Sequence, residues 1–493
     1  MQRISWERTS PEGWQDALKQ MILRQNVALT PVEARAIVSY LSNTHGLAPE
    51  EARPVMYEPE RRIQEERSAP TDSLRETCSK CHPFARALSW RRSREDWKQF
   101  IDSHAARYNI RSTAEAVSFL ANAAPLHTAD WDAWSARTEK PNLAGRWLIA
   151  AYLPGRGSYY GEMQIDRDGD DYNTRVGLKS ERDGSRVIRR GRTSVFGGDA
   201  WRGRSRGPES AGSPDDPVSE AREVLLVSAD QSSAEGRWYW GQYQEFGFYV
   251  KLRRATSEAA LIGVDGSALR TGSSASRIRL NGHNFPAQIA SSDLNFGAGV
   301  TLSRVVSNSG NEIVAEVDVA RDAPLGKHDV AFRTSVLPGA LAIYDRIDYV
   351  KVVPDSAMAS FADQAHPKGY WQFEAIGYQR GPDGKLHTAD DLALGPVDVT
   401  WTAEKFHAAE GSGSDSIGSM SPLGLFTPAD GDFKTNFDVW VIATAKDAKD
   451  ANGAPLVGKS YVVLTVPTYS FNGRQYVRDL DRWVDEGPAT GKP

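Results

Sequence analysis

The two cysteines of this 493-residue chain stand close together in 77-TCSKCH-82, as Cys78 and Cys81, and His82 directly follows them. Cys-x-x-Cys-His is the pattern through which haem c is attached to a polypeptide. The two thiols bond to the haem vinyl groups, and the adjacent histidine is held close enough to ligate the iron from one side. The motif therefore predicts a covalent haem c on Cys78 and Cys81, with His82 as an axial ligand.

The cysteine pair allows three other interpretations. Cys-x-x-Cys can supply half of a zinc site, but the sequence has no further cysteine, and a His82/His104 pairing would be an unusual completion. A redox-active dithiol is expected inside a βαβ pattern, which does not surround this motif. A structural disulfide is the third. The motif and its context favour haem.

A second axial ligand must come from another element, and the sequence up to about residue 140 has helical patterning. Ser10-Pro11 is typical of an N-cap followed by proline at the first helical position. The stretch 30-TPVE-33 is a capping box that starts a helix ending at Gly46. Ser93 resembles another N-cap, and a further helix is expected from Thr113 to Ala124.

The helical region contains an internal repeat. The stretch 10-SPEGWQDALKQM-21 aligns without a gap on 93-SREDWKQFIDSH-104, so that Trp14 matches Trp97 and Met21 matches His104. Met21 and His104 each lie seven residues after the shared tryptophan, about two helical turns, and so share a face with it. Methionine and histidine are the usual distal ligands of haem iron in c-type cytochromes. We therefore predict His104 as the distal ligand of the haem, although a lone histidine on an apolar face is more often a core residue.

The first copy of the repeat carries Met21 but no Cys-x-x-Cys-His of its own. The repeat offset would place that motif immediately before Met1, where a secretory signal is also missing. We therefore expect an N-terminally truncated sequence, in which Met21 is the axial ligand of a first haem and the mature protein is periplasmic. The alternative is a single-haem protein in which Met21 is a core residue.

After residue 140 the pattern becomes alternating and turn-rich, as in all-β domains. The expected fold class is an α-helical cytochrome c domain followed by three all-β domains, a β-barrel and two immunoglobulin-like sandwiches. Asp168-Gly169 predicts a hairpin turn in the barrel, and residues 203–221 predict a long loop. The expected boundaries are 1–140 for the haem domain, 143–255 for the barrel, 258–354 and 367–470 for the sandwiches, and 471–493 for a polar tail.

The composition and the remaining motifs of the chain argue against several classes of function. The net charge of −5 and the pI of about 6.1 argue against a nucleic-acid binder, and no apolar run approaches the roughly 18 residues of a membrane span. The stretch 453-GAPLVGKS-460 matches a phosphate-loop pattern but lies between a turn and a strand, which is the wrong context. The acidic stretch 166–171 lacks the glycine and glutamate of a calcium loop. Four arginines near the haem motif are expected to form a solvated basic patch: Arg86, Arg91, Arg92 and Arg94.

These features resemble the α subunit of bacterial quinohemoprotein amine dehydrogenase. The matching stretches include 10-SPEGW-14, 46-GLAPEE-51, 77-TCSKCH-82 and 341-LAIYDRIDYVKVVP-354, together with the domain order. The resemblance covers nearly the whole chain, although the first haem motif and the secretory signal are absent.

The resemblance implies a periplasmic heterotrimer, completed by a β-propeller subunit and a small subunit that bears cysteine tryptophylquinone. The small subunit would deaminate primary amines, and this chain would only move electrons. It implies a buried haem held by Cys78, Cys81, His82 and His104, and a second haem ligated by Met21. An azurin-like copper protein or a cytochrome c would be the external acceptor. The alternatives are a cytochrome subunit of another periplasmic dehydrogenase and a non-catalytic β-domain scaffold.

Overall fold

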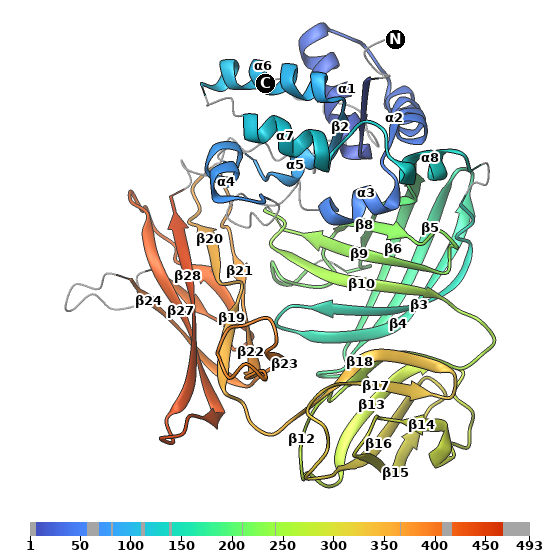
Figure 1. Ribbon diagram of the computed structural model, residues 1–493, viewed down its shortest axis with the longest axis vertical. Helices are drawn as coiled ribbons and strands as arrows, with labels where there is room; N and C mark the ends of the chain where they lie inside the picture. The colour runs from blue at the N-terminus through green and yellow to red at the C-terminus, as the bar shows by residue number, and fades with distance from the viewer. Residues whose placement is uncertain are drawn as a thin grey trace.

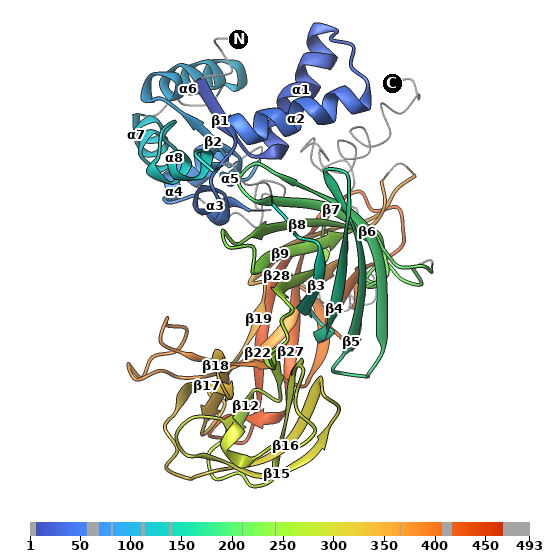
Figure 2. The same cartoon turned by 90° about the vertical axis from the view of Figure 1, so that its right-hand side faces the viewer.

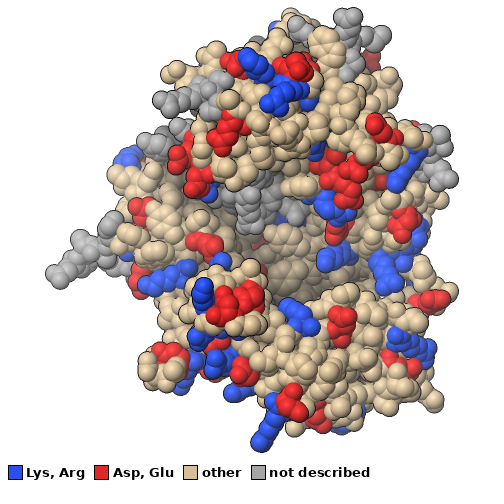
Figure 3. Space-filling view, in the orientation of Figure 1, with Lys and Arg blue, Asp and Glu red and all other residues tan. Residues whose placement is uncertain are grey.

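The computed structural model places the helices at one end of the molecule and the β domains below and beside them (Figure 1). Both signs of charge are interspersed over the surface seen in Figure 3, in keeping with 59 basic and 64 acidic residues. The structure describes residues 6–56, 69–79, 82–109, 114–137, 141–209, 211–241, 243–364, 366–406 and 417–466.

The principal helices begin where the sequence predicts them. In α1 (Pro11–Gln25) the Ser10 side chain accepts the amide N–H of Gly13, and in α2 (Pro31–His45) Thr30 and Glu33 form the capping box. Ser93 caps α6 (Arg94–Tyr108). The shorter helical elements are α3 (Pro49–Ala52), η2 (Arg53–Val55), α4 (Asp72–Cys78), α5 (Ala85–Leu88), α7 (Ala114–Ala123) and α8 (Ala129–Ser135).

The two copies of the repeat form two helical units with matching contacts (Figure 2). In the first unit the indole N–H of Trp14 donates to the carbonyl of His45 at 2.9 Å, at the end of α2. In the second, the indole N–H of Trp97 donates to the carbonyl of Ala124 at 2.9 Å, just after α7. The repeat seen in the sequence is therefore also a repeat of tertiary contacts.

A short ribbon joins the two units. Strand β1 (Glu7–Thr9) pairs antiparallel with β2 (Trp90–Arg92), and each strand precedes the first long helix of its unit. The side chain of Glu51, buried on α3, accepts two hydrogen bonds of 2.7 Å from Arg8 and one of 2.7 Å from the hydroxyl of Thr128. These polar contacts connect β1, α3 and the N-cap of α8.

The barrel closes in the order β10-β3-β4-β5-β6-β7-β8-β9 and is filled by a core rich in tryptophan and phenylalanine. The predicted hairpin turn is confirmed, because β4 ends at Asp168 and β5 starts at Asp171. Its strands are β3 (Gly145–Leu153), β4 (Gly157–Asp168), β5 (Asp171–Ser180), β6 (Arg186–Phe196), β7 (Ala200–Arg206), β8 (Ala221–Val227), β9 (Ser233–Trp240) and β10 (Phe246–Arg254).

The predicted loop over residues 203–221 is wrong at both ends, since β7 continues to Arg206 and β8 begins at Ala221. The glycine, serine and arginine residues at the start of this stretch resemble a loop in composition. They are nevertheless paired with β6, where buried Arg189 donates to the hydroxyl and the carbonyl of Ser205.

The turn between β6 and β7 seats the helical domain on the barrel. Phe196 and Ala200, which flank it, belong to the same core as Trp14 and Val38 of the first helical unit. Gly198 has φ +79°, and a Cβ atom built there would overlap the carbonyl oxygen of Leu47. This close approach requires glycine.

The next β domain is a sandwich of two four-stranded sheets, ordered β11-β13-β16-β15 and β12-β18-β17-β14, around an aliphatic and phenylalanine core. Its strands are β11 (Ala260–Asp265), β12 (Ala268–Arg270), β13 (Ser276–His283), β14 (Leu294–Asn295), β15 (Val300–Asn308), β16 (Glu312–Val319), β17 (Gly326–Phe332) and β18 (Ser335–Tyr344). The short 3₁₀ turn η5 (Ser291–Asp293) precedes β14.

The last β domain is built from the sheets β19-β22-β23, β20-β28-β27-β24 and β21-β26-β25 around a second such core. Its strands are β19 (Tyr349–Val353), β20 (Ser356–Ser360), β21 (Trp371–Gln372), β22 (Glu374–Gln379), β23 (Leu392–Pro396), β24 (Val399–Lys405), β25 (Gly418–Met420), β26 (Leu425–Pro428), β27 (Phe437–Lys449) and β28 (Pro455–Thr465). The expected class, a helical domain followed by a barrel and further β domains, is confirmed.

Two local features of the last domain can be compared with the predictions from the sequence. Strand β19 was expected within the preceding sandwich, but it pairs with β22, and Val350 and Val352 belong to the last core. In the phosphate-loop look-alike 453–460, Gly453 lies in a turn with φ +82°, and the residues from Pro455 onward belong to β28. A phosphate loop needs a helix at that place, whereas the structure has the turn and the strand that the sequence predicts.

Candidate haem site

The cysteine motif begins at the end of a helix. Cys78 is the last residue of α4, and its half-buried side chain packs against the core that contains Leu74, Phe84 and Trp97. Burial, and then the negative charge of Glu115, raise the pKa of the Cys78 thiol. Cys81 lies outside the described residues. The thiol thus faces the apolar surroundings that a haem edge requires.

His82 follows in the turn between α4 and α5. Its Nδ1 lies 3.0 Å from the carbonyl oxygen of Pro83. A carbonyl oxygen only accepts hydrogen bonds, so this contact favours the neutral tautomer with the proton on Nδ1 and the lone pair on Nε2. A backbone carbonyl on the other ring nitrogen is the usual arrangement for a metal-ligating histidine, because it fixes both tautomer and ring orientation.

His104 lies on α6 within a column of aromatic rings. Phe100 stacks on it with centroids 5.5 Å apart, and Tyr108 lies on its other side at 4.7 Å. Burial, and then the charges of Arg107 and Arg86, lower the pKa of His104 below its ordinary value. A neutral imidazole, which is the form that binds a metal, is therefore favoured at neutral pH.

The fold brings together His82, which lies in the turn before α5, and His104, which lies on α6. Their ring centroids are 6.3 Å apart, and the ring planes are inclined at 68°. With a metal–nitrogen bond of about 2 Å on each side, two imidazoles that ligate one ion from opposite sides have centroids roughly 6 Å apart. The spacing of this pair and the tautomer of His82 fit an axially ligated haem iron.

Met21 is placed differently from its counterpart in the repeat. It lies on α1 with 50% of its surface exposed, whereas His104 is half-buried between aromatic rings. The described residues around Met21 include the exposed Leu23 and Val27 rather than a histidine motif. Its role as a ligand stays a prediction.

The expected solvated patch of arginines is wrong for two of its members. Arg91 and Arg92 are buried, with exposures of 6% and 5%. Arg91 donates to the carbonyls of Ala123 and Glu51, and Arg92 forms an ion pair of 3.0 Å with Glu7. These residues occupy β2, which the helical periodicity of the sequence did not reveal.

Sequence reasoning also missed the aromatic column beside His104. Phe100, His104 and Tyr108 recur at intervals of four residues on α6, a spacing that places side chains on one helical face. This spacing is the signal from which ring stacking on the ligand could have been predicted.

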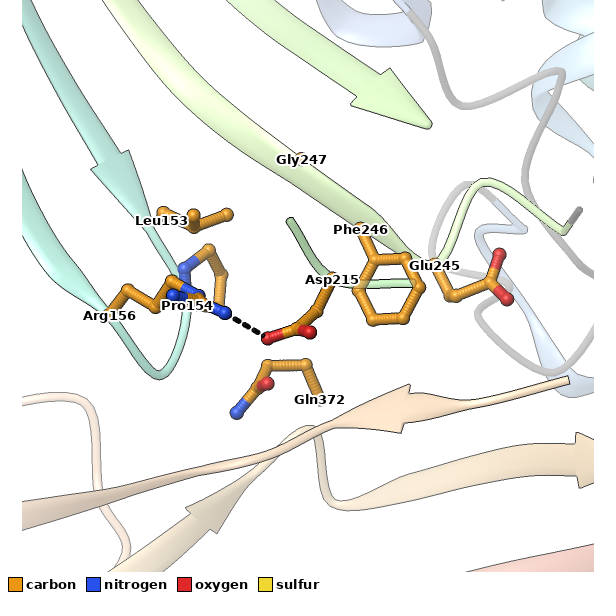
Figure 4. Close-up of a pocket in the computed structure, with 8 residues that line it drawn as sticks. All are labelled: Leu153, Pro154, Arg156, Asp215, Glu245, Phe246, Gly247 and Gln372. Atoms are coloured by element: carbon orange, nitrogen blue, oxygen red, sulfur yellow. Dashed lines mark hydrogen bonds and ion pairs between the residues drawn. The ribbon is translucent and has the colours of Figure 1, made fainter. Parts of the chain in front are cut away.

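A cavity of about 240 Å³ lies between the barrel and the last domain (Figure 4). An ion pair of 2.6 Å between Arg156 and Asp215 crosses it, and Gln372 of β21 forms its floor. None of the residues that line this cavity is a histidine or a cysteine.

The described part of the chain lacks two other kinds of feature. Among these residues, no three or more histidine, cysteine, aspartate or glutamate side chains are grouped so as to hold a metal ion. No described helix has the length and apolar character needed to cross a membrane.

Comparison with protein families accounts for nearly the whole chain. The model described as quinohemoprotein amine dehydrogenase A, alpha subunit, haem binding, matches residues 1–119. The models for domains II, III and IV of the same subunit match residues 140–255, 258–345 and 350–475. The chain belongs to the quinohemoprotein amine dehydrogenase α-subunit family. The helical region of this α subunit, including Cys78 and both histidines, is thus its haem-binding domain.

The other comparisons add little to the family assignment. No curated protein matches this α subunit. Among solved structures, a de novo designed fluorescence-activating β-barrel is 20% identical, covering 23% of this chain and 93% of its own, with a TM-score of 0.19. A redesigned barrel, mFAP0 bound to DFHBI, is 14% identical, covering 23% and 98%, with a TM-score of 0.19. At these scores the likeness says nothing about function.

Proposed function

We propose that this α subunit carries one haem c, bonded to Cys78 and Cys81 and ligated axially by His82 and His104, and that it transfers electrons. The single observation that carries the proposal is the juxtaposition of the two histidines, 22 residues apart in sequence, with ring centroids 6.3 Å apart. Bound haem supplies one-electron redox chemistry at its iron.

The surrounding residues support this role. The Pro83 carbonyl orients His82, and Phe100 with Tyr108 holds the His104 ring. Fully buried Phe84 and Trp97 form part of the adjacent core and exclude water from it. Histidine on both sides gives a lower reduction potential than histidine with methionine, so such a haem suits the receiving end of a relay.

We further propose the assembly that the family implies. The electrons come from cysteine tryptophylquinone in a small partner subunit, which oxidises primary amines, and a β-propeller subunit completes a periplasmic heterotrimer. Met21 would ligate a first haem whose Cys-x-x-Cys-His is not in this chain. From there the electrons pass to an azurin-like copper protein or a cytochrome c.

Secretion of the chain in a bacterium with a cytochrome c maturation system tests haem attachment. The expected product is red, retains haem stain on a denaturing gel, and loses it in a Cys78→Ala/Cys81→Ala variant. His127→Ala, a change at an exposed histidine of the same domain, should keep the stain. A colourless wild-type protein would refute the cytochrome assignment.

Assembly with the two partner subunits tests electron transfer. Addition of a primary amine without oxygen should reduce the haem, seen as sharpening of its visible absorption bands. A haem that stays oxidised in the assembled complex, while dithionite reduces it, would contradict the relay.

A further inference from the structure

Arg92 is a buried cation enclosed by three aromatic rings. Its guanidinium carbon lies 4.4 Å from the ring centroid of Phe100, 4.7 Å from that of Trp90 and 4.9 Å from that of Trp97. Only 5% of the residue is exposed. A desolvated cation over aromatic faces is held by strong cation–π attraction, so the guanidinium and the Phe100 ring constrain each other.

The ring that Arg92 contacts is the ring that supports His104. Phe100 and His104 lie one turn apart on α6 and stack with centroids 5.5 Å apart and planes inclined at 26°. Arg92, Phe100 and His104 therefore form one column, and its far end is the predicted iron ligand. A change in the position or charge of the Arg92 guanidinium can therefore affect His104 through one intervening side chain, the ring of Phe100.

The carboxylate that pairs with Arg92 is more exposed than the carboxylate that pairs with the equivalent arginine of the first unit. Arg8, the equivalent residue of the repeat, makes a two-pronged ion pair with Glu51, whose side chain is 4% exposed. Arg92 pairs with Glu7, whose side chain is 35% exposed. Asp96, in the first turn of α6, also acts electrostatically on Arg92. Solvent weakens the electrostatic effect of an exposed carboxylate on its neighbours more than that of a buried one such as Glu51.

We propose that Arg92 and Glu7 set the reduction potential of the haem ligated by His104, and that Arg92 also positions His104 through Phe100. The inference rests on the proposed function. The oxidised iron carries one more positive charge than the reduced iron, so a nearby buried cation disfavours the oxidised form and raises the potential. The carboxylate of Glu7 acts in the opposite direction.

Spectroelectrochemical titration of the haem in the full chain tests this inference. Glu7→Gln should raise the midpoint potential and Arg92→Met should lower it. At a fixed applied potential each change should shift the ratio of reduced to oxidised haem by roughly threefold to tenfold, because it alters by one unit the charge that acts on the iron in a partly screened environment. Arg92→Lys, which keeps the charge, should stay nearer to wild type than Arg92→Met.

The control is Glu50→Gln, which removes one negative charge from an exposed site on α3. It should leave the potential unchanged. If Glu7→Gln and Arg92→Met keep a low-spin spectrum but shift the potential no more than this control does, or shift it in the same direction, Arg92 has a structural role only and the inference is overturned. Failure of the wild-type chain to bind haem would refute the proposed function instead.

Discussion

Arg8 and Arg91 lie directly opposite each other across the β1–β2 ribbon, and both approach one carboxylate, that of Glu51. Like charges at opposed positions of a ribbon repel each other. The Glu51 side chain offsets this repulsion through two hydrogen bonds of 2.7 Å to Arg8, and its Oε1 lies 3.9 Å from Nε of Arg91. This buried group of three charges stabilises the ribbon that joins the two helical units.

Replacement of Glu51 by Gln should strongly destabilise the helical domain. The change keeps the size of the side chain but leaves two buried guanidinium groups without a counter-charge. Breaking a buried ion pair in this way costs about 3–5 kcal/mol. Urea unfolding followed by helical circular dichroism would measure the loss, and a loss below about 1 kcal/mol would contradict this role.

The same carboxylate predicts acid sensitivity. Burial raises the pKa of Glu51, but the hydrogen bonds and charge of Arg8 outweigh burial and hold the pKa below its ordinary value of 4.5. A carboxyl group whose pKa is depressed by folding contributes stability above its ordinary pKa and loses it as the pH falls through the folded value. The helical domain should therefore lose stability below about pH 4.5, and the Glu51→Gln variant should show a smaller loss over that range. Equal slopes in wild type and variant would contradict the assignment.

The paired tryptophans should contribute similarly in the two units. Trp97→Phe removes the indole N–H that binds the Ala124 carbonyl, and Trp14→Phe removes its counterpart at His45. Each change should cost about 1–2 kcal/mol, from the lost hydrogen bond and the smaller ring. Thermal unfolding followed by circular dichroism would show it. A variant as stable as wild type would show that the shared contact is incidental.

The packing of the helical domain against the barrel should depend on Gly198. Gly198→Ala adds a methyl group that collides with the Leu47 carbonyl, so the two domains should separate while each stays folded. Gly184→Ala is a matched control, because Gly184 has a similar φ of +72° but open space around its Cβ position. Limited proteolysis near residue 140 should be faster in the Gly198 variant only. Equal cleavage rates in the two variants would contradict this prediction, because they would mean that backbone strain, and not the contact with Leu47, causes the effect.

The sequence was informative wherever a local rule governs the structure. Ser10, Thr30 and Ser93 announce three helices because capping side chains satisfy the free amide groups of the first turn. Asp168 and Gly169 mark the hairpin turn because the preference for these residues in tight turns is also a local property of the backbone. The alignment of Trp14 with Trp97 also predicted a shared role, which the matching hydrogen bonds support.

Long-range pairing escaped prediction. Strands β1 and β2 have three residues each, too few for a visible period, and they meet across more than eighty residues of chain. Arg91 and Arg92 therefore looked like exposed charges, since burial of arginine depends on partners such as Glu51 and Glu7 that lie far away in sequence. Strand β19 was assigned to the wrong sandwich because a strand's pattern does not identify its pairing partner.

The ferric absorption spectrum of a His104→Ala variant tests the central claim most directly. Wild-type protein with covalent haem should be low-spin, as expected for His82 and His104 on opposite sides of the iron. The variant should keep its covalent haem but become high-spin, whereas His127→Ala should not change the spectrum. A low-spin spectrum that is unchanged in His104→Ala would contradict the account.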